Sequence, residues 1–460
     1  MFKKSSILSL IVLLGMVGVL IAGCAQQDVG PAAPVSEGSS VPADEAAETV
    51  DQTSATLTVW TGYPELEPFY RDVATQFQVM YPNVKFEFLS TTLREFEAKL
   101  QTALPTCSGP DVFDVESNIT PILVAGQLIE PNPPEIDAIV KSGAYNDFVV
   151  NYFTYDGKTY GIPMIDGSLA SLFYNKDMFI EAGLDPETPP KTFDEMMEYA
   201  KKLTQYDENG EITVSGMSMR LSGQGSGIAE KFWFFLHNMG GDVIVPSDDG
   251  KGWHNGYDNA AGQKALAYYI DSVYKYHVTD HKVPSDAVAF EAGQAAMLLR
   301  ESWVISDIAA NAPDLNYGVA PMPSDVRFDT MTLPAGVYVA SCSENKTLAW
   351  EYAKLLTNDA NTINQVKLTG WLSDRSVDMT ELLKEIPEYE AFVNPPAELG
   401  YYSYPLLTSF DEILTKMADR LVAAYLDGSL VDNPDGIAET IKAMAEETDS
   451  ILKANGQYAP

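Results

Sequence analysis

Strands and helices alternate over residues 57–115, and this alternation constrains the fold more than any other feature of the chain. Apolar residues recur three or four positions apart over 69–80 and 93–104, which is the spacing of one helix face. Short apolar runs around these helices predict three strands, at 57–60, 84–88 and 110–115. Strands that are separated by helices of this length pair in parallel, so the segment predicts an α/β sheet with helices packed on it.

A second α/β unit begins near residue 165. Residues 168–174 and 295–299 are apolar runs of strand length. No internal repeat relates this unit to the first one. Because residues 55–460 are too many for one compact core, we expect the chain to fold into two lobes.

The N-terminus has the features of an export signal. Lys3 and Lys4 precede an uncharged apolar run, 7–22, which is shorter than the roughly 20 residues that span a bilayer. Small residues follow this run and lead directly to Cys24. This order is typical of a bacterial lipoprotein signal, in which residues 1–23 are removed and Cys24 carries a lipid on its sulfur. A simple secretory signal with an incidental cysteine, or an uncleaved anchor, is the alternative.

Residues 24–54 are rich in Pro, Ala, Ser and acidic side chains, and no Lys or Arg occurs between Lys4 and Arg71. Such a segment buries too little apolar surface to offset the entropy of ordering it, and its like charges extend it. We therefore expect a disordered tether that lifts the folded part off a membrane. A disordered tail without function would have the same composition.

The formal net charge of −36 limits the binding partners of the chain. Nucleic-acid binding requires basic patches, so we expect no nucleic-acid partner, and adhesion to anionic lipid is disfavoured for the same reason. The acidity itself is typical of a solvated surface and does not identify a ligand. With 24 Tyr and 6 Trp, the chain has the material for an aromatic binding site.

Several short segments, taken in order, resemble the extracellular solute-binding proteins of sugar ABC importers, the maltose-binding-protein-like group. The resemblance covers most of residues 55–455, and no single segment is decisive. The matching segments are 155–163 (YDGKTYGIP), 173–177 (FYNKD), 182–184, 189–195 (PPKTFDE), 240–242, 293–297 with Trp303, 349–351 and 369–370.

The resemblance implies a periplasmic-binding-protein-like fold of two lobes joined by a hinge. Each lobe is expected to hold a mixed, mostly parallel sheet flanked by helices. Lobe I is expected at 55–164 plus 319–361, and lobe II at 165–318 plus 362–460. The ligand would lie in the cleft between the lobes, at the carboxyl ends of the strands.

The resemblance also implies a function and its partners. The chain would be the substrate-binding lipoprotein of an ABC importer, which captures a sugar or oligosaccharide and delivers it to the transmembrane subunits of a permease. It would be a monomer, held to the membrane through the lipid on Cys24, on the extracellular side of the cell or in the periplasm. It would need no cofactor and catalyse no reaction.

A sugar site needs flat aromatic faces for the C–H side of the ring and polar groups for the hydroxyls. Trp303 matches a tryptophan that stacks on sugar in relatives, and Tyr63 and Glu65 match ligand contacts in the loop after the first strand. The other candidates are Glu116, Ser117, Asn118, Asp166, Glu230, Trp233, Trp371, Arg375 and one of Tyr401, Tyr402 and Tyr404, for which we take Tyr402.

Other roles remain open for several of these residues. Trp303 and Trp233 could be core residues, and Ser117 or Asn118 could cap a helix. Many relatives carry a tyrosine and a proline where this chain has Trp371 and the residues after it, which puts that contact in doubt.

Two other functions remain open. A cationic solute such as a polyamine would suit aromatic rings beside Glu65, Glu116 and Asp166. A surface enzyme acting on polysaccharide is the other alternative, although no carboxylate pair can be singled out among 65 acidic residues. The four histidines lack an H-E-x-x-H motif, so we expect no metal site.

The resemblance finally implies a disulfide. After Cys24, the chain contains only Cys107 and Cys342, and the compartment permits oxidation. In this family the chain returns to lobe I on a strand antiparallel to its neighbours, and residues 336–340 fit that strand. It would end on the side of lobe I where Cys107 lies, just before the strand at 110–115. The alternative is that Cys107 and Cys342 are two separate small core residues with no bridge between them.

Replacing Cys24 tests the anchor. In a bacterial host, Cys24→Ala removes the sulfur that would carry the lipid, so the protein should move from the membrane fraction to the soluble fraction. Ser36→Ala in the tether is the control and should stay with the membrane. A Cys24→Ala protein that remains membrane-bound, while its folded part is soluble alone, would contradict the anchor.

Overall fold

The structure is a computed structural model that describes residues 52–460 except 168, 224 and 285. The expected signal peptide, Cys24 and most of the expected tether therefore lie outside the described residues. Within them, no helix is both long and apolar enough to cross a membrane.

The first sheet has the order β2-β1-β3-β15-β6 in the described part of the chain. Its strands are β1 (Ala55–Thr61), β2 (Val84–Ser90), β3 (Val112–Glu116), β6 (Ile162–Asp166) and β15 (Pro334–Val339). β1 pairs in parallel with β2 and β3, whereas β15 runs antiparallel to β3 and β6. This sheet is thus mixed, with two parallel and two antiparallel pairings, and the parallel pairing predicted for its first three strands is confirmed.

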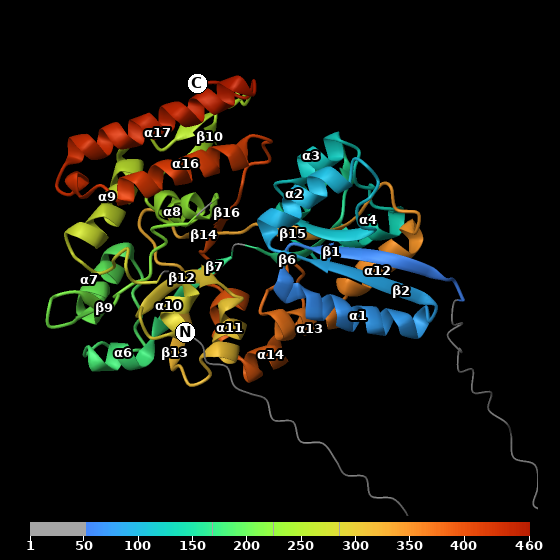
Figure 1. The fold of residues 1–460 in the computed structure, drawn as a ribbon, viewed down its shortest axis with the longest axis horizontal. Coiled ribbons are helices and arrows are strands. Elements are labelled where there is room, and N and C mark those ends of the chain that lie inside the picture. Colours follow the sequence, from blue (N-terminus) through green and yellow to red (C-terminus); the bar gives the residue numbers. More distant parts are fainter. Residues whose placement is uncertain (1–51, 168, 224, 285) are drawn as a thin grey trace, which may run out of the picture. The chain divides into compact units, whose positions relative to one another are not determined.

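Helices cover both faces of this sheet, and together they form the first lobe (Figure 1). One face carries α1 (Glu67–Met80) and α12 (Lys346–Leu356), and the other carries α2 (Leu93–Ala103), α3 (Thr120–Ala125) and α4 (Pro134–Val140). α5 (Asp147–Tyr152) precedes β6. The predicted apolar stripe of α1 is buried through Phe69, Val73 and Phe77, while Met80 at its end is 38% exposed. The helical spacing therefore identified the buried face.

The second sheet, β12-β7-β13, differs from the mostly parallel sheet that we expected. β12 (Met297–Glu301) and β13 (Tyr317–Ala320) are joined by α11 (Val304–Asn311), and both run antiparallel to β7 (Ala170–Asn175). The connection through α11 makes β12 and β13 parallel to each other, and β7 lies between them in the opposite direction. Ser215 and Ser218 add parallel bridges beyond β12.

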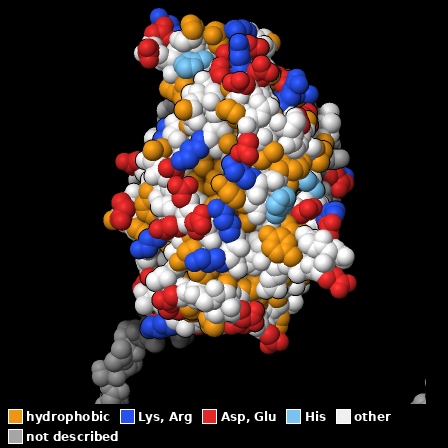
Figure 2. Space-filling model, turned by 90° about the vertical axis from the view of Figure 1, so that its left-hand side faces the viewer, with side chains coloured by type: hydrophobic (Ala, Val, Ile, Leu, Met, Phe, Trp, Pro, Cys, Tyr) orange, Lys and Arg blue, Asp and Glu red, His pale blue; other side chains and the backbone are white. Residues whose placement is uncertain are grey.

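The second lobe consists of this sheet and the helices packed around it (Figure 1). Its larger core cluster includes Phe232, Trp233 and Leu236 of α8 (Gly227–Asn238), and a smaller cluster includes Phe173 of β7 and Leu298 of β12. On the face shown in Figure 2, acidic and basic side chains are interspersed and no basic patch gathers. The other elements are α6 (Lys176–Glu181), α7 (Phe193–Leu203), α8 (Gly227–Asn238), α9 (Ala260–Tyr274), α10 (Ala287–Glu291), α16 (Phe410–Tyr425), α17 (Pro434–Ala454) and the hairpins β8–β9 (Gln205–Tyr206, Ile212–Val214) and β10–β11 (Asp242–Pro246, Trp253–Gly256).

Over residues 52–460, apart from the three that the structure does not describe, the chain crosses between the lobes three times. It leaves the first lobe after β6 and returns between β14 (Asp329–Met331) and β15. β14 pairs with β16 (Gly400–Tyr402) of the second lobe. The third crossing follows α13 (Asp359–Thr369), which packs against α1 on one side and α11 on the other.

The expected return to lobe I at residue 319 is corrected by the strand pairing. Val319 pairs with Phe173 of β7, so β13 stays in the second sheet. The chain enters the first sheet only at Pro334, which lies opposite Asp166 of β6. The boundary could not be read from the sequence because it depends on which strand accepts β13 as a neighbour.

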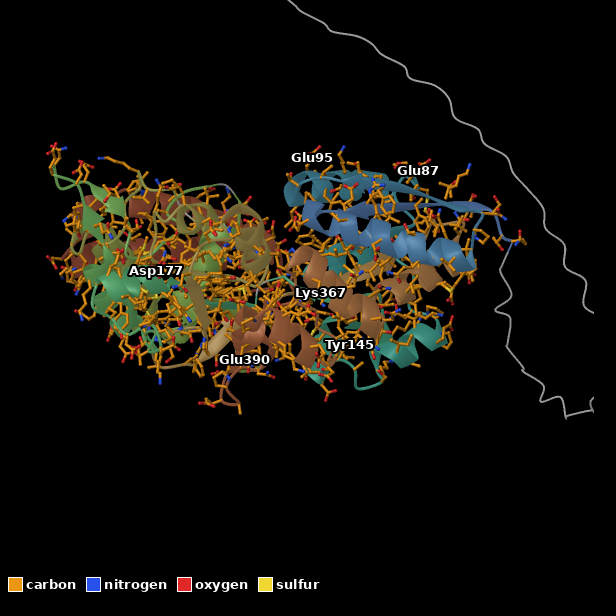
Figure 3. The ribbon with its side chains drawn as sticks, turned by 90° about the horizontal axis from the view of Figure 1, so that it is seen from below. Glu87, Glu95, Tyr145, Asp177, Lys367 and Glu390 are labelled. Atoms are coloured by element: carbon orange, nitrogen blue, oxygen red, sulfur yellow. A yellow bond between two sulfur atoms is a disulfide. The ribbon has the colours of Figure 1, made fainter. Side chains whose placement is uncertain are left out.

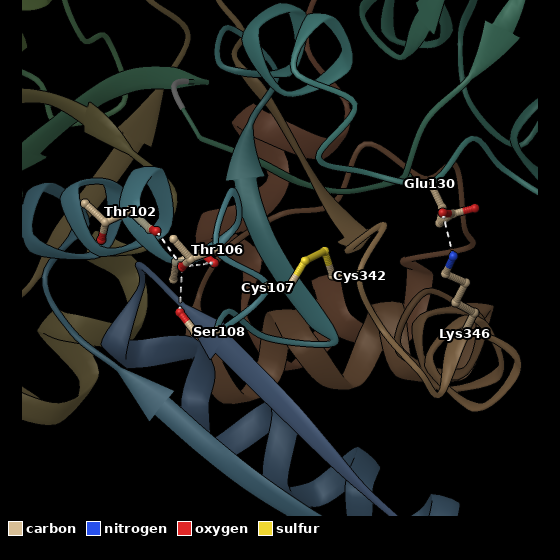
Figure 4. Close-up of a disulfide and its surroundings, with 8 residues drawn as sticks. Thr102, Thr106, Cys107, Ser108, Glu130, Cys342 and Lys346 are labelled. Atoms are coloured by element: carbon tan, nitrogen blue, oxygen red, sulfur yellow. Dashed lines mark hydrogen bonds and ion pairs between the residues drawn. A yellow bond between two sulfur atoms is a disulfide. The ribbon is translucent and has the colours of Figure 1, made fainter.

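A disulfide joins Cys107 and Cys342, whose Cα atoms lie 5.4 Å apart (Figure 4). Cys107 follows α2 and Cys342 follows β15, 235 residues later. β15 begins beside the second crossing and runs away from it, so the bridge lies at the far end of the first sheet. It therefore fastens the returning segment to the first lobe without spanning the hinge.

Reduction should weaken the fold of the first lobe. By the chain-entropy argument, a loop of this length contributes at most about 5 kcal/mol to the free energy of unfolding. Urea unfolding of the wild type should shift to lower denaturant when a reductant is added, whereas a Cys107→Ala/Cys342→Ala variant should not respond to it. Finding both thiols alkylatable in oxidised, folded protein would rule the bridge out.

Candidate functional site

Tyr63 and Glu116 meet at one edge of the first sheet. Tyr63 follows β1 and Glu116 ends β3, and these parallel strands bring their carboxyl ends to the same edge. The Tyr63 hydroxyl donates to Glu116 Oε1 over 3.0 Å. Burial, followed by the negative charge of Glu116, raises the pKa of Tyr63 well above its usual range, so the hydroxyl remains a donor.

Two tryptophans from other parts of the chain join this pair. Trp371, just after α13, donates its Nε1 proton to Glu65 Oε1 over 3.0 Å. Its ring meets Tyr63 edge-on, with centroids 5.8 Å apart, and lies 6.4 Å from the ring of Trp303. The structure thus brings together five residues from separate segments, Tyr63, Glu65, Glu116, Trp303 and Trp371, which we call the site cluster.

Buried charged side chains contact the Trp303 indole. Glu301 is 2% exposed, and its Oε2 accepts hydrogen bonds from Trp303 Nε1 over 3.2 Å and from Arg300 Nη1 over 2.5 Å. Lys231 Nζ donates to Oε1 of the same carboxylate. The Arg300 guanidinium also lies over the Trp303 ring, 5.0 Å from its centroid. Glu301 therefore fixes the orientation of the indole while it balances two buried cations.

Electrostatic attraction dominates the ionisation of Glu301. Its burial alone would raise the pKa of the carboxyl, but the nearby charges of Arg300 and Lys231 outweigh this effect and lower the pKa to about 2. Arg300 is also paired with Asp286. The result is a desolvated group of charges that stays ionised through the neutral range.

The series of ion pairs and hydrogen bonds continues to Tyr404. Lys231 also pairs with Glu230 at 2.8 Å, and Glu230 Oε2 accepts the Tyr404 hydroxyl over 2.8 Å. The Tyr404 carbonyl in turn accepts the hydroxyl of Tyr152 from the first lobe over 3.0 Å. We call the charged residues Glu230, Lys231, Asp286, Arg300 and Glu301 the ion network.

Tyr402, the aromatic residue that we expected in the site, packs in the second core, and its contact with a ligand stays a prediction. Its ring stacks on His237 with centroids 3.7 Å apart, and it packs against Trp233 in the second core. Trp233 is 3% exposed and donates Nε1 to Asp242 Oδ1 over 3.1 Å, so it is also a core residue. Tyr404, two positions on, also packs against Trp233, and its hydroxyl donates to Glu230 Oε2 over 2.8 Å.

Asp166 and Arg375 have hydrogen-bond partners outside the site cluster. Asp166 accepts hydrogen bonds from Leu169 N and Leu333 N, over 3.1 and 3.2 Å, and from the Thr332 hydroxyl. Arg375 Nε donates to Asp359 Oδ1 over 2.7 Å, and its guanidinium lies over the Tyr145 ring. Both side chains therefore have structural partners, which a position in the sequence could not reveal.

Ser117 and Asn118 do not cap a helix with their side chains. The residue before α3 is Ile119, and no side-chain hydrogen bond caps that helix. Ser117 Oγ and Asn118 Oδ1 are buried without a hydrogen-bond partner among the described residues. Asn118 directly follows the strand end that carries Glu116, so its oxygen is an acceptor close to the site cluster in the chain.

The sequence reasoning missed Lys231, Arg300 and Glu301. Charged side chains are rarely buried unless they are paired, so the Arg300–Glu301 pair at the end of the apolar strand before Trp303 was a usable signal.

Among the described residues, no group of three or more His, Cys, Asp or Glu side chains is placed to hold a metal ion. The arrangement offers stacking surfaces and hydrogen-bonding groups.

Comparison with known proteins identifies relatives across most of the chain. The family model described as "Bacterial extracellular solute-binding protein" matches residues 72–376. The sn-glycerol-3-phosphate-binding periplasmic protein of Escherichia coli is 26% identical over 378 residues, which cover 76% of this chain and 80% of that protein. The maltotriose-binding protein of Pyrococcus abyssi is 24% identical over 326 residues, covering 68% of this chain and 65% of that protein.

A solved structure shows the same fold. It is an ABC transporter solute-binding protein from Thermotoga lettingae bound with alpha-D-tagatose, which matches with a TM-score of 0.71 at 24% identity. The match covers 87% of this chain and all of that chain. It confirms the predicted two-lobed α/β fold class.

Glu301→Gln should strongly destabilise the second lobe at neutral pH, because it leaves Lys231 and Arg300 buried with too little negative charge. We expect a loss of about 3–5 kcal/mol in the free energy of unfolding. The folded pKa of Glu301, about 2, lies below the unfolded value, so its contribution is present above pH 4.5 and is lost as the pH falls towards 2.

Urea unfolding of wild type and variant between pH 7 and pH 3 measures this difference. Glu95→Gln is the matched control, since Glu95 is exposed and pairs only distantly with Lys99, and it should change nothing measurable. A Glu301→Gln variant as stable as the wild type at pH 7 would contradict the assigned role.

Proposed function

Since the chain belongs to the family of bacterial extracellular solute-binding proteins, we propose that it captures a neutral sugar between its two lobes and delivers it to an ABC permease. The observation that carries this proposal is the site cluster, which combines three aromatic rings with two carboxylates. Aromatic faces stack on the C–H side of a sugar ring, and carboxylate oxygens accept hydrogen bonds from its hydroxyl groups. Relatives named for maltotriose and bound with alpha-D-tagatose support the same ligand class.

The ion network favours an uncharged ligand over a phosphate ester. A phosphate is held by cations with free hydrogen-bonding capacity, typically arginine or lysine. Lys231 is paired with Glu230 and Glu301, and Arg300 with Glu301 and Asp286. Because three carboxylates neutralise these two cations, the network supplies no net positive charge for an anionic ligand such as sn-glycerol 3-phosphate.

Closure of the lobes would complete the site. Tyr63, Glu65 and Glu116 belong to the first lobe, Trp303 to the second, and Trp371 to the third crossing. A sugar that contacts all of these residues binds one relative position of the lobes better than the others, so it shifts the population towards that position. The permease would then recognise the loaded form.

The remaining parts of the proposal concern location and form. The family is extracellular, and the lipid on Cys24 would hold the protein at the outer surface of its membrane. We propose that it acts as a monomer and releases its ligand unchanged, because its family consists of binding proteins.

A thermal-shift screen followed by calorimetry tests the ligand class. Neutral mono-, di- and trisaccharides should include compounds that raise the melting temperature, since a ligand that binds only the folded state stabilises it by mass action. Glycerol phosphate and spermidine should not. With the best sugar, Trp303→Ala should weaken binding by roughly 2–4 kcal/mol, as expected for a stacking anchor.

Tyr206→Ala is the control for the loss of an aromatic ring, because Tyr206 is 47% exposed and lies on the β8–β9 hairpin. It should leave the affinity unchanged. Binding of spermidine or glycerol phosphate alone would replace the sugar proposal with another solute. Turnover of a glycoside would indicate an enzyme.

A further inference from the structure

A cavity lies at the hinge, apart from the site cluster. Its volume is ≈650 Å³, which is within the range of small-molecule sites. Asp166 lines this cavity, whereas the next residue, Gly167, faces the other way: a Cβ on Gly167 would lie 3.9 Å from both Glu116 Oε1 and the Tyr63 hydroxyl. None of the residues of the site cluster lines the cavity. The cavity and the cluster are therefore on opposite faces of the hinge.

The cavity wall comes from both lobes and from all three crossings. Phe148 of α5 belongs to the first lobe, and Phe392 packs in the core beside the second sheet. Asp166, Thr332 and Asp374 come from the first, second and third crossings in turn. Tyr145, which contacts Arg375 beside the cavity, is labelled in Figure 3 where the α5 segment meets the chain after α13.

One carboxylate oxygen in the wall lacks a hydrogen-bond donor among the described residues. Asp374 Oδ2 is buried and has no hydrogen-bond partner among the described residues. Burial, followed by the charge of Asp166, raises the pKa of Asp374 well above its usual range. Arg375 also lines the cavity: its Nε donates to Asp359 Oδ1 over 2.7 Å, its guanidinium lies over the Tyr145 ring, and its Nη1 is buried without a hydrogen-bond partner among the described residues. A donor or a cation supplied from outside would satisfy Asp374 at a site that already holds a second carboxylate.

Apolar and aromatic side chains make up much of the rest of the wall, which also includes Asn146, Thr332, Ser373, Arg375 and Ser376. Phe148 and Tyr401 are 36% and 48% exposed, which is unusual for large rings, and both line the cavity. Aromatic faces attract cations through their quadrupole, so the rings and the two carboxylates favour the same kind of ligand. The net charge of −36 adds a general attraction for cations.

We propose that the hinge cavity binds a small organic cation, an ammonium group attached to an apolar or aromatic body. The ammonium group donates to Asp374 Oδ2 and lies near Asp166, and the apolar body packs between Phe148, Tyr401 and Phe392.

Such a ligand would also regulate the sugar site. The cavity is lined by both lobes, so its shape depends on their relative position, and an occupant favours one position. Binding at two sites that prefer different lobe positions is coupled, and the coupling is reciprocal. This regulatory part rests on the proposed function, whereas binding of the cation does not.

Titration calorimetry of the folded, full-length protein with 2-phenylethylamine tests the site. Its neutral counterpart, 2-phenylethanol, has the same aromatic body and should bind at least about tenfold more weakly, the size expected for one hydrogen bond to a charged group. Asp374→Asn should weaken binding of the amine by a similar factor. The variant should fold, because it removes a repulsion with Asp166, and its thermal unfolding verifies this; if it does not fold, Phe148→Ala replaces it.

Trp303→Ala separates the two sites. It should leave amine binding unchanged, even if no sugar is found to bind. Amine binding that survives Asp374→Asn, that Trp303→Ala abolishes, or that 2-phenylethanol reproduces with equal affinity would overturn the proposed site. Where a sugar is known, an unchanged sugar affinity at saturating amine would overturn the coupling alone.

Discussion

The hydrogen bonds of Asp166 hold the three crossings of the chain against one another. Its backbone N–H donates to the Leu372 carbonyl of the third crossing over 3.0 Å, and its carboxylate accepts from Thr332 and Leu333 of the second. Asp166 itself ends β6 and begins the first crossing. These bonds join the three segments that pass between the lobes in the described part of the chain, so they constrain how the lobes are placed.

This arrangement gives the two faces of the hinge different chemistry. On one face, Gly167 leaves space beside Glu116 and Tyr63, and the strand ends and Trp371 supply polar and aromatic groups. On the other face, Asp166 and Asp374 share a cavity with exposed aromatic rings. One chain segment thus lies between the proposed sugar site and the proposed cation site, so a movement of the hinge would change both.

Local features of the fold could be read from the sequence, and long-range ones could not. The helical spacing of Phe69, Val73 and Phe77 and the parallel order of β1 to β3 follow from short-range patterns. The antiparallel placement of β7 and the return at Pro334 depend on pairing between strands more than a hundred residues apart, for which periodicity carries no signal. For the site, the loops after β1 and β3 and the tryptophan after β12 were predictable because strand ends meet at one edge of a sheet. The burial of Lys231 with Glu301 was not predicted, because it depends on packing between α8 and β12, which are far apart in the sequence.

The central claim is that a neutral sugar is held by the site cluster between the lobes, and a crystal structure with the best sugar from a binding screen tests it most directly. We predict that the sugar ring stacks on Trp303 or Trp371 and that its hydroxyls contact Glu65 or Glu116, so that both lobes touch one ligand. A sugar found in the hinge cavity beside Asp374, or on the surface of one lobe only, would contradict the account.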